Sequence, residues 1–386
     1  MSFLMFKMIF LSIYVGLSAL ITYYIYQEEK PYYTPMYVTK KPKKEGDLEE
    51  KVNIHDEFPE FNKIDKPMNF IKIFIGVLTL FWIRFIINVI LTVILTIKIK
   101  NRYKEKNGKY DKEDIKYIID STKCLTKWFL RVSGMILDFK RLPDEKVLPV
   151  YQKYFGPDCK LDYDGKYSCI ISNHTCIYDM GLAMYTFGSG FVAKEAVKNI
   201  PFFGKLMLGL QTILVDRNSS GSKNDSLEKL GKRQKEYYEG EPVMPFMIFP
   251  EGTTTSGRHL ISFKKGCFNA LLPIKATIIH PNLNKDFHLG CGTTDVMTNF
   301  LRSLAELYFK VEYIELPILT PNEYMFKNFE NLGKEKWEIF AEVTREIMAT
   351  LGGLKISNFG IRDNFRYYSC LKEKTYLDRD TYKIRT

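Results

Sequence analysis

A histidine and an aspartate five residues apart are the side chains of this sequence best suited to moving a proton. They are His174 and Asp179, in the segment NHTCIYD at residues 173–179. A neutral imidazole accepts a proton near neutral pH, and a carboxylate beside it fixes the tautomer and orientation of the ring. Because the chain has five histidines, this spacing arises by chance about one time in four. The surrounding sequence must therefore decide between a general base and a structural histidine.

Two polar turns follow apolar runs that are typical of buried strands. CIIS precedes the histidine, and a helix-forming run, MGLAMYTFG, follows the aspartate. MPFMIF precedes the turn formed by Pro250, Glu251 and Gly252 within the segment FPEGTTT. Sites in α/β proteins are built where the strands of the sheet end. The two turns therefore predict one shared site and indicate an enzyme.

Four segments occur in the order of the motifs of a known family. NHTCIYD resembles the first motif of the glycerolipid acyltransferases, the PlsC-type enzymes, and FPEGTTT resembles the third. ILVDR resembles the second motif, FVAKEAVKNIPFFGKL is similar to the segment that leads into it, and SFKKGCFNALLPI resembles the fourth. Four motifs in order over about a hundred residues are far more specific than any one of them. FPEGTTT and WEIFAEVTREIMATLGG look most like the lysophosphatidylcholine and lysophosphatidylethanolamine acyltransferase branch, and the resemblance covers roughly residues 70–365.

The resemblance implies transfer of a fatty acyl group from acyl-coenzyme A to a hydroxyl group of a lysophospholipid or of glycerol phosphate. It implies His174 as the general base and Asp179 as the carboxylate that orients it. Arg217 would bind the phosphate of the acceptor, and Lys194 is a second candidate for this role. Acyl-coenzyme A is expected as a co-substrate, with no bound cofactor and no metal. The substrate-binding set is completed by Asn173, Glu251, Gly252, Thr253 and Thr254.

Alternative roles stay open for several of these side chains. Arg217 could form a surface salt bridge with Asp216, and Lys194 could cap a helix. Cys176 could be a thiol nucleophile, but a residue two positions after the histidine points away from it in a strand or a turn. Glu251 is expected to orient the acceptor or the phosphate-binding residues rather than to move protons.

Three departures from the family pattern limit which properties of the family can be expected of this chain. Thr254 stands where many members have arginine, as is often the case in the lysophospholipid branch. Ala276 stands where the fourth motif usually has a second proline. The sequence after Gly353 lacks the regularly spaced acidic ligands of a calcium-binding hand, so calcium regulation is not expected.

Two apolar segments place this chemistry at a membrane. Residues 3–26 are long and apolar enough to cross a bilayer, and they predict a transmembrane anchor over 1–27. A cleaved signal peptide is the alternative, which the length of the run and the lack of a small-residue cleavage pattern disfavour. Residues 70–98 are divided by Arg84 and have lysine-rich flanks. A membrane-embedded helical hairpin over 68–107 is therefore favoured over a single crossing.

The composition agrees with an enzyme that works at a membrane surface. A formal net charge of +11 would hold the domain against anionic lipid head groups. Nucleic-acid binding is disfavoured because the charge is spread thinly beside apolar segments, with no recognisable nucleic-acid module. Seven cysteines without a CxxC pair predict neither a zinc site nor a disulfide framework, which indicates a reducing compartment.

The alternation of apolar strands with helical stretches predicts an α/β fold with a mixed, mostly parallel sheet flanked by helices. The predicted strands are CIIS, ILVD, FMIF, IKATII and YIELPI. The acyltransferase domain is expected over 108–355, between a charged linker at 28–67 and a polar C-terminal tail at 356–386. The linker is too poor in apolar residues to form a core, and the tail shows no apolar periodicity.

The sequence therefore predicts an integral membrane acyltransferase of the endoplasmic reticulum or mitochondrial membrane. Its expected partners are membrane lipids, a lysophospholipid and acyl-coenzyme A. An alternative from a different class is an acyltransferase-like structural or lipid-binding subunit of a large membrane protein complex, because a fold can outlive its function. The acceptor head group and the acyl-chain preference stay open.

Overall fold

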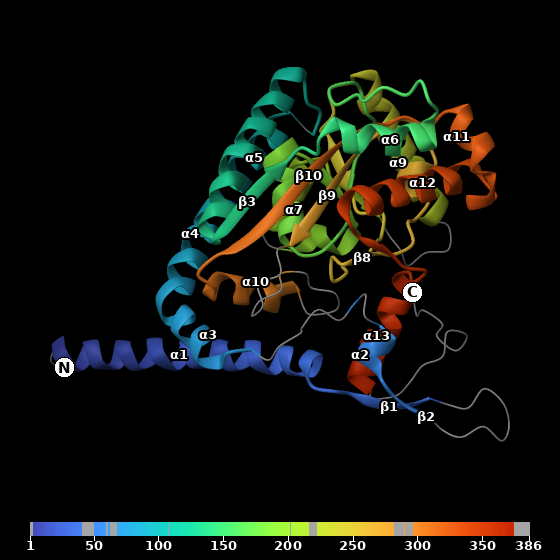
Figure 1. Ribbon diagram of the computed structural model, residues 1–386. Helices are drawn as coiled ribbons and strands as arrows, with labels where there is room; N and C mark the ends of the chain where they lie inside the picture. Colours follow the sequence, from blue (N-terminus) through green and yellow to red (C-terminus); the bar gives the residue numbers. More distant parts are fainter. Residues whose placement is uncertain are drawn as a thin grey trace.

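The computed structural model describes residues 3–40, 50–58, 61, 68–106, 108–200, 202–215, 222–281, 289 and 296–373. At its centre is a seven-stranded sheet with the strand order β3-β10-β9-β4-β7-β5-β6, and helices lie against it (Figure 1). Neighbouring strands are parallel except β9 and β10. The predicted mixed, mostly parallel sheet flanked by helices is therefore confirmed. The strands are β3 (Met135–Lys140), β4 (Ile170–Ser172), β5 (Gly190–Lys194), β6 (Ile213–Val215), β7 (Phe246–Ile248), β9 (Ile274–Pro281) and β10 (Phe309–Leu319).

The central strands are buried because helices cover both faces of the sheet. Successive side chains of a strand point to opposite faces, so Ile170 and Ile171 of β4 belong to two different apolar cores. A parallel sheet covered on both faces requires continuous apolar runs, which explains the pattern of the predicted strands. The helices of one core are α6 (Asp144–Phe155), α9 (Ser222–Glu239) and α12 (Lys336–Gly352); those of the other are α4 (Trp82–Glu105), α5 (Lys112–Val132), α7 (Tyr178–Phe187) and α8 (Phe203–Gly209).

Among the described residues, two helices are long and apolar enough to cross a membrane, judged by length and composition. The first, α1 (Phe3–Tyr33), extends away from the sheet (Figure 1). The second is continuous: α3 (Phe70–Gly76) passes through a π-helical segment (Val77–Phe81) directly into α4. The backbone thus stays helical from residue 70 to residue 105, and the hairpin predicted over 68–107 is wrong.

Arg84 does not divide this helix, because its charge is satisfied by another part of the chain. Its guanidinium donates to the backbone oxygens of Leu304 at 3.2 Å and Leu307 at 2.8 Å, and also to that of Glu306. These carbonyl groups lie at the end of α10 (Val296–Ala305), where the helix dipole and its unpaired oxygens attract a cation. The arginine therefore connects the long helix to the end of α10.

The segments before and after the predicted acyltransferase domain are folded where the structure describes them. β1 (Tyr37–Lys40), β2 (Glu50–Asn53) and α2 (Ile54–Glu57) lie in the predicted charged linker, and α13 (Ile361–Glu373) lies in the predicted polar tail. α2 and α13 lie side by side (Figure 1) and share a buried cluster that includes Phe58 and Tyr367. The prediction that the linker forms no core is wrong, because its apolar residues join a cluster with residues that lie far away in the sequence.

The rest of the predicted linker and tail, including 41–49 and 374–386, lies outside the described residues. The remaining elements are short. They are β8 (His259–Leu260), β11 (Lys355–Ile356), α11 (Glu323–Asn328) and the 3-10 helices Glu195–Asn199, Gly266–Phe268 and Glu330–Leu332.

Replacing Arg84 with methionine tests this account of the second long helix. Arg84→Met leaves three backbone oxygens without their donor, so we expect the free energy of unfolding to fall by about 1–3 kcal/mol. Thermal unfolding in detergent micelles measures the loss. Ile83→Met changes an exposed neighbour and should alter stability by less than about 0.5 kcal/mol. Equal stability of the two variants would show that the arginine does not hold the helix.

Candidate active site

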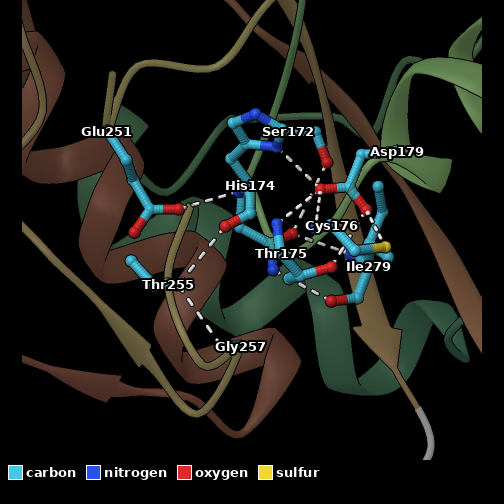
Figure 2. A network of polar contacts seen from close by, with 10 residues as sticks. Ser172, His174, Thr175, Cys176, Asp179, Glu251, Thr255, Gly257 and Ile279 are labelled. Atoms are coloured by element: carbon cyan, nitrogen blue, oxygen red, sulfur yellow. Dashed lines mark hydrogen bonds and ion pairs between the residues drawn. The ribbon is translucent and has the colours of Figure 1, made fainter. Parts of the chain in front are cut away.

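β4 and β7 pair in parallel, so the two predicted turns lie together at the carboxyl end of the sheet. The N–H group of Thr255 donates to the backbone oxygen of His174 at 2.9 Å. In return, the N–H group of His174 donates to Oε1 of Glu251 at 2.9 Å. Figure 2 shows the residues of both turns gathered around the histidine. The two turns therefore meet in one site.

His174 and Asp179 form a direct hydrogen-bonded pair (Figure 2). Nδ1 of His174 lies 2.8 Å from Oδ2 of Asp179. Asp179 stands in the first turn of α7, where helix N–H groups favour an anion. Its side chain is fully buried, whereas 21% of the His174 side chain is exposed. An ionised carboxylate only accepts hydrogen bonds, so Nδ1 carries the proton and Nε2 keeps the lone pair that a general base needs.

Further donors surround the carboxylate of Asp179. Oδ2 also accepts from the N–H groups of Thr175 and of Cys176, the latter at 2.9 Å. Oδ1 accepts from the Thr175 hydroxyl at 2.9 Å and from the Cys176 thiol at 3.3 Å. These bonds stabilise the ionised form and compensate for its burial. The Cys176 thiol is thus directed at Asp179, which agrees with the expectation that it is not a nucleophile.

An aromatic ring also holds the imidazole. Phe249 stacks on His174 with ring centroids 4.0 Å apart and an interplanar angle of 13°. This contact fixes the plane of the imidazole and shields one of its faces from water. The sequence pattern presents Phe249 only as the last residue of a strand. Its place directly before the turn at Pro250 is the signal that could have identified it.

Glu251 supports the backbone of His174 from a fully buried position. Its Oε1 accepts from the N–H group of His174, and its Oε2 accepts from the N–H group of Ile261 at 3.2 Å. Burial raises the pKa of Glu251 from its ordinary value of 4.5 to about 8, and the two backbone donors partly oppose this shift. Both oxygens are engaged with the backbone, so the group that Glu251 orients in this structure is His174.

Asn173 and Gly252 shape the backbone of the two turns. The Asn173 amide is buried and pairs with the backbone of Ile279 in β9, donating at 2.9 Å and accepting at 2.8 Å. It thereby continues the pairing of β4 with β9 beyond the end of the strand. Gly252 has a φ of 72°, and a β-carbon there would lie 2.5 Å from Nζ of Lys264. This turn therefore favours glycine.

The other predicted site residues stand at or after the ends of β5, β6 and β7 in the sequence. Lys194 is exposed at the carboxyl end of β5, and Thr253 and Thr254 are half-buried in the turn after Glu251. Arg217 lies outside the described residues, so its role as a phosphate ligand stays a prediction. Within the described part of the chain, no three His, Cys, Asp or Glu side chains are grouped so that they could hold a metal ion.

Comparisons with known proteins agree with this chemistry. Residues 163–281 match the acyltransferase family. Lysophospholipid acyltransferase LPEAT1 of Arabidopsis thaliana is 28% identical over 212 residues, which cover 55% of this chain and 51% of that protein. Lysophosphatidylcholine acyltransferase 2 of Homo sapiens is 26% identical over 199 residues, which cover 50% of this chain and 34% of that protein. The chain thus spans about half, or less, of the length of these curated relatives.

A solved structure is also similar to this chain. It is the crystal structure of PlsC, the 1-acyl-sn-glycerophosphate acyltransferase from Thermotoga maritima, with a TM-score of 0.39 and 17% sequence identity; the match covers 71% of this chain and 100% of that chain. The family match includes the strand ends that carry His174 and Glu251. Residues 163–281 therefore resemble the acyltransferase family, and the similarity to LPEAT1 and to lysophosphatidylcholine acyltransferase 2 supports the lysophospholipid acyltransferase branch that the motifs resemble.

Proposed function

We propose that the chain transfers a fatty acyl group from acyl-coenzyme A to the free hydroxyl group of a lysophospholipid or of glycerol phosphate. The observation that carries this proposal is the pair of His174 with the buried Asp179, joined at 2.8 Å. Two relatives bear the names of lysophospholipid and lysophosphatidylcholine acyltransferases, which supports the class of acceptor. The thioester donor follows from the family resemblance.

The proposed reaction moves one proton twice. Nε2 of His174 takes the proton of the acceptor hydroxyl while the hydroxyl oxygen attacks the carbonyl carbon of the thioester. The tetrahedral intermediate then breaks its carbon–sulfur bond, and the imidazolium returns the proton to the sulfur of the leaving coenzyme A. Asp179 stabilises the imidazolium between these steps. The products are the acylated lipid and free coenzyme A, and His174 ends in its starting form.

Two cations supply the phosphate contact in this proposal. Lys194 is exposed at the end of β5, which pairs with β7 in parallel. Lys194 therefore lies at the same carboxyl end of the parallel strands as His174. Arg217 comes two residues after β6 in the sequence, and its guanidinium can bind two phosphate oxygens at once. A hydrogen bond to such a charged group contributes about 1.5–3 kcal/mol.

The long apolar helices support an integral membrane protein, which would give the enzyme direct access to a lipid acceptor. The net charge of +11 favours contact with anionic head groups. The compartment that we propose is the endoplasmic reticulum or the mitochondrial membrane. A purely structural subunit would not require a buried carboxylate aligned with a partly exposed imidazole, so the arrangement of His174 and Asp179 favours catalysis.

An assay of purified protein with a panel of lysophospholipids and acyl-coenzyme A tests the proposed function. We expect His174→Ala to lower kcat by about 10²- to 10⁴-fold, because the variant lacks the general base, while its melting temperature stays close to that of the wild type. His280→Ala is the matched control. It removes a histidine of β9 that pairs in register with Glu312 of β10, and it should keep its activity. Equal product from the wild type and His174→Ala, or none from either, would overturn the proposal.

The stability of the protein should fall with rising pH because of Glu251. Its pKa in the folded state, about 8, lies above the ordinary value of 4.5. Between these two values the folded protein keeps a proton that the unfolded chain has released, so folding becomes less favourable as pH rises. In Glu251→Gln this titration is absent, and only a constant offset from the altered hydrogen bonds remains.

Denaturant unfolding across this pH range measures the effect of Glu251. We expect the free energy of unfolding of the wild type, minus that of Glu251→Gln, to decrease steadily from pH 4.5 to pH 8. A difference that increases over the same range would mean that Glu251 is ionised more easily in the folded protein than in the unfolded chain.

A further inference from the structure

Two segments that lie far apart in the sequence form a small folded unit that contacts Ile261, which we call the terminal clasp. It consists of β1, β2, α2 and α13, together with Phe359 before α13. Its buried cluster also includes one residue of the catalytic domain, Ile261. The buried members of the cluster are Val38, Ile54, Phe58, Phe61, Ile261, Tyr367, Cys370 and Leu371.

A buried histidine joins two helices of the clasp, α2 and α13, to the end of α1. Nε2 of His55 lies 3.1 Å from the backbone oxygens of both Pro31 and Thr34, at the end of α1. Carbonyl groups only accept, so Nε2 carries the proton and Nδ1 accepts from the hydroxyl of Tyr367 at 2.9 Å. Burial lowers the pKa of His55, which favours this neutral form. His55 therefore connects the end of α1 to α13.

Aromatic rings continue this connection toward the catalytic domain. The ring of Tyr367 lies 5.6 Å from that of Phe58 and 6.2 Å from that of Phe61, measured between centroids. Phe61 in turn stacks on Phe359 at 6.4 Å with an interplanar angle of 12°. Contacts of this kind stabilise a cluster beyond the apolar area that they bury. Tyr367 thus occupies the centre of the clasp.

Two adjacent residues link the clasp to the active site. The N–H group of Ser262 donates to the backbone oxygen of Phe359 at 2.9 Å. The side chain of Ile261 is buried in the aromatic cluster, while its N–H group donates to Oε2 of Glu251. The other oxygen of Glu251 accepts from the N–H group of His174. A continuous series of contacts therefore runs from Tyr367 to the proposed general base.

We propose that the terminal clasp positions His174 for catalysis, with Tyr367 as the central positioning residue. The clasp holds Ile261 in place, Ile261 holds one oxygen of Glu251, and Glu251 holds the backbone of His174. Its effect on turnover rests on the proposed acyltransferase function, whereas its effect on the backbone of the site does not. Displacements of about 1 Å near reacting groups can cost about 10²-fold in rate, so a clasp outside the site is able to control it.

The test compares three variants in the full-length chain. Tyr367→Ala removes the ring, Tyr367→Phe keeps the ring but removes the bond to His55, and Tyr154→Ala is the control. Tyr154 is a buried tyrosine of α6 that packs against Phe329, in the main apolar core and outside the clasp. Hydrogen–deuterium exchange at the amides of His174 and Ile261 is measured together with kcat and the KM of the acceptor.

We expect Tyr367→Ala to accelerate exchange at both amides by about 10-fold, since the donors to Glu251 open locally. It should lower kcat by about 10-fold and change the acceptor KM by less than about 3-fold, because the base is displaced while the acceptor contacts remain. Tyr367→Phe should restore most of the protection and most of kcat. Tyr154→Ala should lower the melting temperature with both exchange rates and kcat within about 2-fold of the wild type.

Unchanged exchange at His174 and Ile261 in Tyr367→Ala would overturn the clasp proposal, whether or not the protein is an active acyltransferase. Equal acceleration in Tyr154→Ala would also overturn it, because the effect would then reflect a general loss of stability. A wild-type protein without acyltransferase activity would overturn the proposed function and the catalytic part of the clasp proposal. The exchange rates would still decide the structural part.

Discussion

A buried carboxylate destabilises a folded protein unless donors surround it, and the proposed site depends on one such group. Asp179 is fully buried, and it accepts hydrogen bonds from His174, Thr175 and Cys176. All these donors belong to the short segment between β4 and α7. The segment cannot rearrange without leaving the charge unpaired. The same bonds that make burial of Asp179 tolerable therefore fix Nδ1 of the histidine and leave Nε2 as the basic atom.

The parallel sheet converts this local arrangement into a site. β7 runs beside β4 in the same direction, so the turn after β7 reaches the histidine that follows β4. Phe249 then holds the plane of the imidazole, and Glu251 holds the backbone of the same residue. Asp179, Phe249 and Glu251 thus restrain His174 from three directions. An imidazole restrained in this way loses little entropy when it accepts a hydrogen bond from a bound molecule, as the proposed role of a general base requires.

The strands and the contact between His174 and Asp179 could be predicted from sequence because both depend on local patterns. A strand covered on both faces must be a continuous apolar run, as CIIS and FMIF are, and the polar residues at its end are conspicuous. Contacts between distant parts of the chain could not be predicted in this way. The backbone oxygens that bind Arg84 lie 220 or more residues away from it, so the sequence showed an arginine in an apolar run without its partners.

The terminal clasp could not be predicted from sequence for the same reason. Phe58, Phe61 and Tyr367 are isolated aromatic residues in polar segments, and their cluster forms only when the segments before and after the central sheet meet. Periodicity within one segment carries no sign of such a core. The buried position of Glu251 was hidden for a related reason: a glutamate in a polar turn predicts a contact with substrate, whereas its partners here are backbone N–H groups.

The rate of acyl transfer by Asp179→Asn tests most directly whether His174 acts as a base because Asp179 holds it. The rate is measured by mass spectrometry of the lipid product formed from an isotopically labelled acyl-coenzyme A, at a temperature where the variant and the wild type are both folded. An asparagine can donate to Nδ1 and so favours the tautomer whose Nε2 carries the proton and cannot accept another. The account predicts a rate at least about 100-fold below that of the wild type. A rate within about 2-fold of the wild type would contradict it.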